Sequence, residues 1–186
     1  MIIVLVGESA SGKSTIENLI RNRNKSFSKI VSYTTRPMRD KETEGIDYHF
    51  ISDEEFESMI KNDDFVEFAK YRGWNYGSAK KDYNDNKNHI AVLTPHGCRT
   101  LKRWGDNNNT KIISIYFKVD RRSRMIKILN RGDDIDEAYR RNISDVGQFD
   151  GFEDEADYII NNDNYKKGIE EIYSETMNIV KGEMNE

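Results

Sequence analysis

Cysteine and proline are scarce in this 186-residue chain, in which Cys98 is the only cysteine and there are two prolines. A single cysteine excludes a disulfide within the chain and is typical of a reducing compartment. Long hydrophobic runs are also missing. The longest, Ile2–Val6, is far shorter than the roughly 20 apolar residues that cross a membrane, and no signal-peptide pattern occurs. We therefore expect a cytoplasmic protein that has no membrane partner.

An excess of basic residues is lacking too. Lysine and arginine total 29 against 33 aspartates and glutamates, which gives a net charge of −4. Such a chain is not suited to generic nucleic-acid binding, so any anion must be bound by a local cluster of basic side chains. Hydrophobic residues make up 36% and aromatic residues 11%, which is enough for the core of one compact domain, with or without small inserted lobes.

The first 23 residues show the pattern of a strand followed by a helix. Ile2–Val6 does not alternate with polar residues, which is typical of a strand buried on both faces. Ile16, Leu19 and Ile20 have helical spacing, so we expect a helix from Lys13 to about Arg23. A strand, a glycine-containing loop and a helix in this order favour an α/β fold with a parallel sheet.

The loop between this strand and this helix, residues 7–14 (GESASGKS), matches G-x-x-x-x-G-K-[ST] in full. Its glycines let the backbone wrap around phosphate oxygens, and the helix N-terminus adds partial positive charge. Lys13 supplies a full charge, and the Ser14 hydroxyl can ligate Mg²⁺. We expect a nucleoside triphosphate with Mg²⁺ here; the alternative is a chance glycine-rich turn. The residues predicted to bind ATP in this loop are Gly7, Glu8, Ser9, Ala10, Ser11, Gly12, Lys13, Ser14 and Thr15.

The remaining pattern predicts a five-stranded core with two insertions, residues 32–89 and 121–153. A Ser52-Asp53-Glu54-Glu55 capping box predicts a helix from Ser52. The other predicted strands end at Ile30-Val31 or cover 65–71, 90–93, 112–119 and 158–160, and a Pro95-His96-Gly97 turn is expected after the third of these. The other predicted helices cover 121–130, 136–143 and 165–180.

The first insertion carries a cluster of groups that suits a phosphate monoester. Arg36 and Arg39 lie three apart around a proline, and Tyr48 follows in the same polar stretch. A planar guanidinium binds phosphate oxygens in pairs, which makes arginine the preferred residue for this task. Taken alone, these residues could equally form a solvated basic loop.

Together with the surrounding motifs, the stretch resembles guanylate kinase. Ser32-x-x-Thr35-Arg36-Pro37-x-Arg39, Gly45-x-Asp47-Tyr48-x-Phe50, Phe65–Ala69 and Gly73-x-x-Tyr76-Gly77-Ser78 follow one another, and Asn130-Arg131-Gly132 and Ile159–Asp163 come later. With the phosphate loop, the resemblance covers nearly the full length. It implies a P-loop NTPase core with a parallel five-stranded sheet flanked by helices, an inserted mixed α/β lobe that binds a nucleoside monophosphate, and a small helical lid. The corresponding residues would be 1–31, 90–120 and 154–186 for the core, 32–89 for the lobe and 121–153 for the lid.

The resemblance also implies an activity, transfer of a phosphoryl group from ATP to GMP or dGMP, and a role for individual residues. It implies that Arg36, Arg39, Tyr48 and Tyr76 bind the acceptor phosphate, and that Ser32, Ser78, Glu67 and Thr94 contact the base. It places Arg131, Arg141 and Lys127 on the lid and Asn162 near the adenine of the donor. With Lys13, the three lid residues would be the catalytic groups, acting electrostatically, since an anionic acceptor needs no strong base.

One departure leaves alternatives open. Guanylate kinases usually carry an acidic pair after the strand at 90–93, whereas this chain has Thr94 and no carboxylate there. A broader deoxynucleoside monophosphate kinase is therefore a second hypothesis. A non-catalytic guanylate-kinase-like interaction domain is a third, and the intact phosphate loop argues against it. A sugar phosphate acceptor is disfavoured by Ser32, Glu67 and Ser78. The expected partners are small nucleotides, with the chain acting as a monomer or homodimer.

Overall fold

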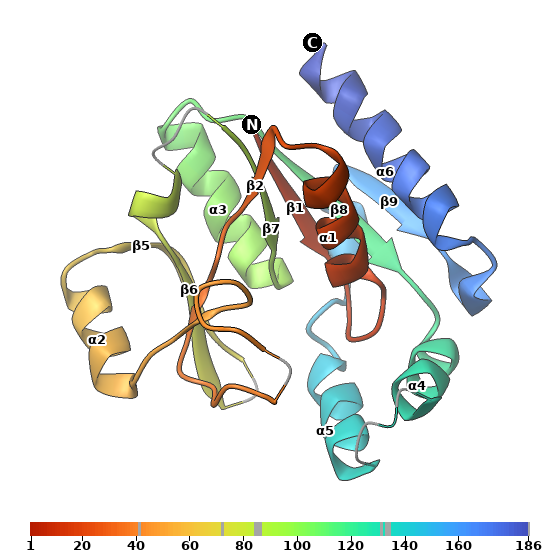
Figure 1. The fold of residues 1–186 in the computed structure, drawn as a ribbon, viewed down its shortest axis with the longest axis horizontal. Helices are drawn as coiled ribbons and strands as arrows, with labels where there is room; N and C mark the ends of the chain where they lie inside the picture. Colours follow the sequence, from red (N-terminus) through yellow and green to blue (C-terminus); the bar gives the residue numbers. More distant parts are fainter. Residues whose placement is uncertain (41, 72, 84–86, 131, 133–134, 186) are drawn as a thin grey trace.

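The computed structural model describes residues 1–40, 42–71, 73–83, 87–130, 132 and 135–185. Figure 1 shows three parts: a central sheet with helices on both sides, a smaller sheet with one helix to its left, and two helices below it on the right. Within the described residues, none of the helices has the length and apolar character that would let it span a membrane.

The central sheet is entirely parallel, in the order β2-β7-β1-β8-β9. Its strands are β1 (Ile2–Val6), β2 (Phe27–Lys29), β7 (Asn88–Val92), β8 (Ile112–Lys118) and β9 (Tyr158–Asn161). The first strand lies in the middle, which is why all five of its residues are buried and why its sequence shows no alternation. The predicted five-stranded parallel core is confirmed.

Helices cover both faces of this sheet, and the first strand divides its side chains between them. Ile3 and Leu5 belong to one hydrophobic cluster, which includes residues of α1 (Lys13–Arg23) and α6 (Ile169–Met184). Ile2, Val4 and Val6 belong to the other, which includes residues of α3 (Pro95–Asn107). The resulting three-layer α/β architecture places the carboxyl ends of the parallel strands at one edge, where ligands of such sheets bind.

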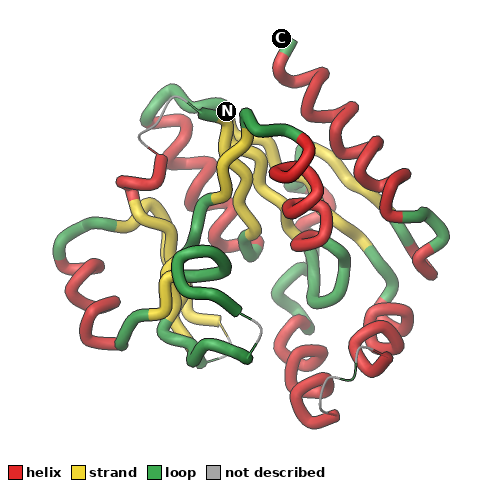
Figure 2. Tube along the Cα trace, viewed as in Figure 1, coloured by secondary structure: helices red, strands yellow, loops and turns green. Residues whose placement is uncertain are grey.

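A second, four-stranded sheet has the order β4-β3-β6-β5. Its elements are β3 (Tyr33–Thr34), β4 (His49–Phe50), β5 (Phe65–Tyr71), β6 (Trp74–Ala79) and the helix α2 (Asp53–Lys61). This sheet is mixed, with β3 parallel to β4 and antiparallel to β6, and Figure 2 shows it apart from the central sheet. The predicted capping box is confirmed: the Ser52 hydroxyl accepts from Glu55 N, and the Glu55 carboxylate accepts from Ser52 N.

The third part consists of α4 (Arg121–Asn130) and α5 (Ile135–Asp145), which contact each other and lie below α1 in Figure 1. Three short 3₁₀ helices complete the described chain, η1 (Lys80–Tyr83), η2 (Phe152–Asp154) and η3 (Asp163–Tyr165). The two predicted lid helices are therefore present, and the second is one residue longer at its start and two at its end than the sequence pattern indicated.

Three sequence predictions were wrong in detail. The Pro95-His96-Gly97 turn is the first turn of α3, because Thr94 acts as its N-cap and proline is tolerated at the first helical position, where its missing N–H costs nothing. The second strand ends at Lys29 rather than at Ile30-Val31. The last helix also starts later than predicted, at Ile169, after the separate turn η3.

Candidate active site

The phosphate loop adopts backbone conformations with positive φ. Gly7 has φ 154° and Ala10 has φ 66°. A side chain at Gly7 could not be accommodated, because its Cβ would lie 2.7 Å from both Phe117 O and Ser11 Oγ. The loop therefore approaches the neighbouring strand β8 more closely than any other residue at this position would allow.

Lys13 folds back over the loop from the first turn of α1. Its ammonium donates to Glu8 O at 2.9 Å and to Ser11 Oγ at 3.2 Å. This holds the full positive charge beside the N-terminus of the helix, where an anion is favoured. The neighbouring Ser14 hydroxyl is exposed at the same helix end.

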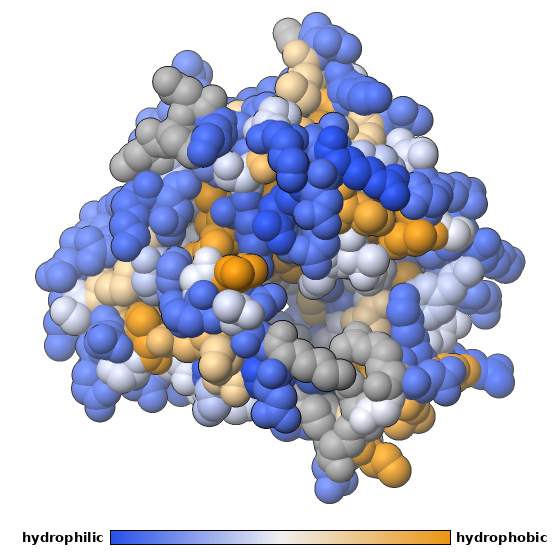
Figure 3. Space-filling view, viewed as in Figure 1, coloured by the Kyte–Doolittle hydropathy of each residue, from blue (hydrophilic) through white to orange (hydrophobic). Residues whose placement is uncertain are grey.

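Two cavities meet at this loop. One, of about 600 Å³, is lined by Ser11 and Gly12, and the other, of about 380 Å³, by Gly7, Ser9, Ala10, Lys13 and Ser14. Figure 3 shows a hollow near the centre of a largely hydrophilic face. The phosphate loop is therefore the boundary between two pockets rather than the floor of one, while Glu8 and Thr15 line neither of these two.

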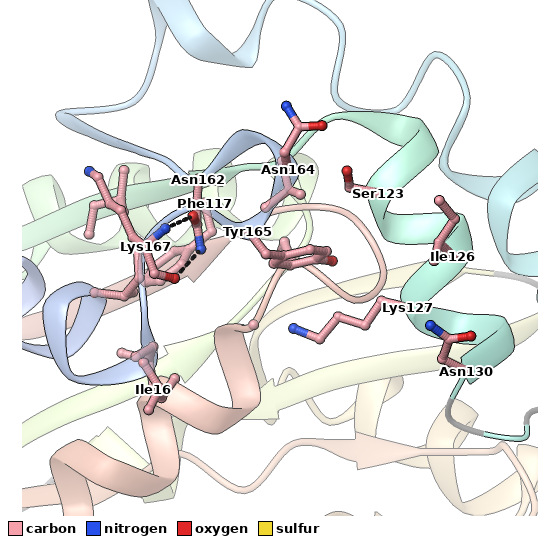
Figure 4. A pocket seen from close by; sticks show the side chains of 16 residues that line it. Ile16, Phe117, Ser123, Ile126, Lys127, Asn130, Asn162, Asn164, Tyr165 and Lys167 are labelled. Atoms are coloured by element: carbon pink, nitrogen blue, oxygen red, sulfur yellow. Dashed lines mark hydrogen bonds between the residues drawn. The ribbon is translucent and has the colours of Figure 1, made fainter.

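The larger cavity is closed by side chains from α4 and from the segment after β9 (Figure 4). Lys127 Nζ lies 4.0 Å from the centroid of the Tyr165 ring, whose hydroxyl donates to Ala10 O at 2.9 Å. Asn162 exchanges two hydrogen bonds with the backbone of Lys167, so its amide shapes this wall. Apolar residues such as Ile16 and Ile172 complete the lining of this pocket.

The smaller cavity brings together the arginines of the first insertion. Arg36 is buried, donates to Glu42 Oε1 at 2.7 Å and lies 5.3 Å from the centroid of the Tyr48 ring. Arg39 N donates to the other Glu42 oxygen at 2.9 Å. Burial opposes the ionisation of Glu42, but the hydrogen bonds from Arg36 and from Arg39 N, together with the positive charges of both arginines, outweigh it and lower the pKa of Glu42. Sequence reasoning missed Glu42, because no local pattern in this loop indicated its pairing with Arg36.

The same wall carries two tyrosines that face each other. The rings of Tyr48 and Tyr76 are 5.9 Å apart in an edge-to-face arrangement. Burial raises the pKa of Tyr48 to about 12, so its hydroxyl stays protonated and can donate to an anion at neutral pH. Lys29, which the sequence analysis did not single out, donates to the backbone carbonyls of Ile46 and Asp47 and so fixes the loop that carries Tyr48.

The same cavity is also lined by a buried carboxylate, Glu67. It sits directly across the sheet from Ser78, whose hydroxyl donates to Glu67 Oε1 at 2.8 Å and accepts from Tyr83 at 2.9 Å. Burial raises the pKa of Glu67 to about 7. The other oxygen lies 2.9 Å from the position that a Cβ on Gly97 would occupy, so a side chain there would displace the carboxylate. Ser78 is fully buried behind Glu67 and does not line the cavity.

Ser32, Tyr76 and Thr94 all line this cavity, as the resemblance implies. The Thr94 hydroxyl accepts from Gly97 N at 3.2 Å as the N-cap of α3. It thus contributes to the fold, whatever else it contacts.

Of the residues predicted to lie on the lid, those that the structure describes are divided between the two cavities. Arg141 and its neighbour Arg140 line the smaller one, and Lys127 lines the larger. Arg131 lies outside the described residues. Arg124, on the same helix as Lys127, is buried and donates to Glu8 Oε1 at 3.2 Å.

Among the described residues, no group of three or more His, Cys, Asp or Glu side chains is arranged to hold a metal ion. The Ser14 hydroxyl is a single hard oxygen donor. It fits Mg²⁺, which keeps several of its waters and is otherwise bound by one or two protein groups and by substrate phosphates.

This combination defines a class of protein: a P-loop α/β protein with two cavities that meet at one phosphate loop. The profile of the guanylate kinase family, "Guanylate kinase", matches residues 1–181. The chain belongs to the guanylate kinase family.

Named relatives agree with this assignment. The chain is 30% identical to a guanylate kinase of Fusobacterium nucleatum, over 97% of each chain. It is 31% identical to one of Clostridium tetani, over 94% of this chain and 84% of the relative. The crystal structure of a guanylate kinase from Anaplasma phagocytophilum has the same fold, with a TM-score of 0.69 at 24% sequence identity. The match covers 98% of this chain and 85% of the Anaplasma chain.

Proposed function

We propose that this protein transfers the terminal phosphoryl group of ATP to GMP or dGMP, forming ADP and GDP or dGDP. The observation that carries the proposal is the position of the phosphate loop between the two cavities. Donor and acceptor nucleotides bound on either side would bring their phosphates together at Lys13. In-line transfer needs this positioning and nearby cations more than it needs covalent chemistry.

On the acceptor side, Arg36, Arg39, Tyr48 and Tyr76 would bind the phosphate. Glu42 holds Arg36 in place before the substrate arrives, which lowers the cost of ordering a long side chain on binding. The acceptor phosphate is anionic near neutral pH, so its oxygen attacks without a protein base.

Glu67 would read the base. Its ionised carboxylate can accept from two adjacent donors, the ring N–H and the exocyclic amine of guanine. Adenine presents an acceptor at the ring nitrogen and would leave a buried carboxylate oxygen unpaired, a mismatch that hydrogen-bonding sites reject strongly. Ser78 and Tyr83 orient the carboxylate from behind.

On the donor side, the loop N–H groups and Lys13 would bind the ATP phosphates, and the cavity beside Asn162 would hold the adenine. Lys127, Arg131 and Arg141 would add positive charge around the transferring group. Mg²⁺, held by Ser14 and the substrate phosphates, would neutralise negative charge on the triphosphate. In this scheme residues 32–89 form the acceptor lobe, 121–153 the lid and the rest the core.

The cellular context is part of the same proposal. A single buried cysteine is compatible with the reducing cytoplasm. Nucleotides are the partners that the two cavities suit, and we propose a monomer or homodimer that binds no nucleic acid.

A coupled assay of ADP release with GMP, dGMP, AMP, dTMP and dCMP tests the activity. We expect turnover with GMP and dGMP. Lys13→Ala should abolish it while leaving thermal unfolding unchanged, and Lys25→Ala, which changes an exposed lysine just beyond the same helix, should keep full activity. No turnover with any acceptor would refute the proposal.

A broader acceptor range is the second candidate, and Thr94 is the observation that favours it. This residue has no charge and its oxygen already caps α3, so this position supplies no carboxylate to contact the base. The same screen decides. A guanine preference above about a thousandfold, on the scale of hydrogen-bonding readers, excludes the broader range.

A further inference from the structure

Another buried carboxylate, Asp145, has been given no role so far. It is the last residue of α5, and its side chain is 3% exposed. It accepts from Ser9 N of the phosphate loop at 2.9 Å and from the Tyr71 hydroxyl of β5 at 2.5 Å. One side chain therefore joins the lid, the phosphate loop and the acceptor sheet.

A buried guanidinium completes the arrangement. Arg124 NH1 lies 3.7 Å from Asp145 Oδ2, while its NH2 donates to Glu8 Oε1 at 3.2 Å and its Nε to Val119 O at 3.0 Å. Both adjoining residues of the phosphate loop, Glu8 and Ser9, are thus held by side chains of the lid. A buried charge that loses its partner is costly, so the contacts favour one relative position of these parts.

The position of Asp145 on its helix connects it to the cavity. Arg141 lies four residues earlier, on the same face of α5, and lines the acceptor cavity. The neighbouring Arg140 lies 5.1 Å from the centroid of the Trp74 ring in β6. Helix α5 therefore contacts the acceptor sheet twice, through Asp145 with Tyr71 and through Arg140 with Trp74.

We propose that Asp145 is a positioning residue for phosphoryl transfer. It touches neither cavity's expected ligand directly. It anchors α5 so that Arg141 faces the acceptor cavity, and it fixes the Ser9 end of the phosphate loop relative to that cavity. This inference rests on the proposed function, because positioning matters only if two phosphates must meet in line.

A positioning role makes a specific prediction about what fails when the anchor is removed. The phosphoryl group leaves ATP for the acceptor oxygen in the aligned complex. In a misaligned complex, water accepts it instead and yields ADP and inorganic phosphate. Loss of Asp145 should thus raise the ratio of ADP released to GDP formed above one. A purely structural loss would lower both products equally.

The experiment uses Asp145→Asn, Asp145→Ala and Tyr71→Phe, with Asp150→Asn as the control, since Asp150 is an exposed carboxylate shortly after the same helix. We expect kcat for GDP formation to fall about 100-fold in Asp145→Ala and about tenfold in the other two, magnitudes typical of lost hydrogen bonds to a charged group. The KM values for ATP and GMP should stay within about threefold. GMP titration should still give one site per chain, which shows that the lost activity is not an unfolded fraction.

If Asp145→Ala does not fold, Tyr71→Phe decides, because it removes one hydroxyl and leaves no charge unpaired. Unchanged kcat with a product ratio of one in Tyr71→Phe and Asp145→Asn would overturn the inference. So would equal losses in Asp150→Asn. A wild-type protein without turnover would overturn the proposed function and this inference with it. An active wild type whose Asp145 and Tyr71 variants keep its kcat and product ratio would refute only the role of Asp145.

Discussion

The raised pKa of Glu67 leads to a prediction about stability. In the folded protein without nucleotide this pKa is about 7, against 4.5 for an ordinary glutamate, and the cause is burial. Each pKa unit is worth about 1.4 kcal/mol, so burial costs the ionised form about 3 kcal/mol relative to the unfolded chain. Between pH 4.5 and 7 the folded state therefore holds a proton that the unfolded state has lost.

The sign follows from proton linkage. Since the folded state binds the extra proton, its stabilising contribution is fully present below pH 4.5 and is lost as the pH rises through about 7. Glu67→Gln cannot titrate at this position. The difference in free energy of unfolding between wild type and Glu67→Gln should thus shift by about 3 kcal/mol against the wild type from pH 4.5 to 8.

Urea unfolding at four or five pH values measures this difference directly. The same pair of proteins tests the link to the acceptor, because guanine needs the ionised carboxylate. The KM for GMP should fall in the wild type as the pH rises through about 7. The GMP phosphate titrates near pH 6 in both proteins, so the difference between them isolates Glu67. Parallel stability curves and parallel KM profiles would refute the reasoning.

Three further substitutions test the site and the fold. Gly97→Ala places a Cβ 2.9 Å from Glu67 Oε2; the KM for GMP should rise about tenfold or more with the KM for ATP unchanged, and an unaltered KM for GMP would contradict the packing. Arg39→Ala should raise the KM for GMP about tenfold or more, measured by the coupled assay, because a charged contact to phosphate is lost. Ser52→Ala removes the cap of α2 and should cost about 1 kcal/mol in urea unfolding without changing kcat; a loss near zero would show that the capping box contributes nothing.

The phosphate loop could be predicted from the sequence because its determinants are local. The strand, the glycines, Lys13 and the helix lie within one continuous segment, and each residue acts on its neighbours. The same holds for the helix start at Ser52, where both reciprocal hydrogen bonds span three residues. The beginning of α3 was missed for the opposite reason. Thr-Pro occurs both at turns and at helix N-termini, and nothing local distinguishes the two.

Residue types and spacing alone thus determined the parallel core, the phosphate loop and the family, since hydrophobic periodicity and motif order can be recognised without knowing how the chain packs. Only the tertiary structure decided that Glu42 pairs with Arg36, that Gly97 leaves room for Glu67, and that Asp145 meets Ser9 across 136 positions of sequence. The last two contacts join segments far apart in the chain. They depend on burial and on how the lobes pack, and burial is also what raises the pKa of Glu67 to about 7.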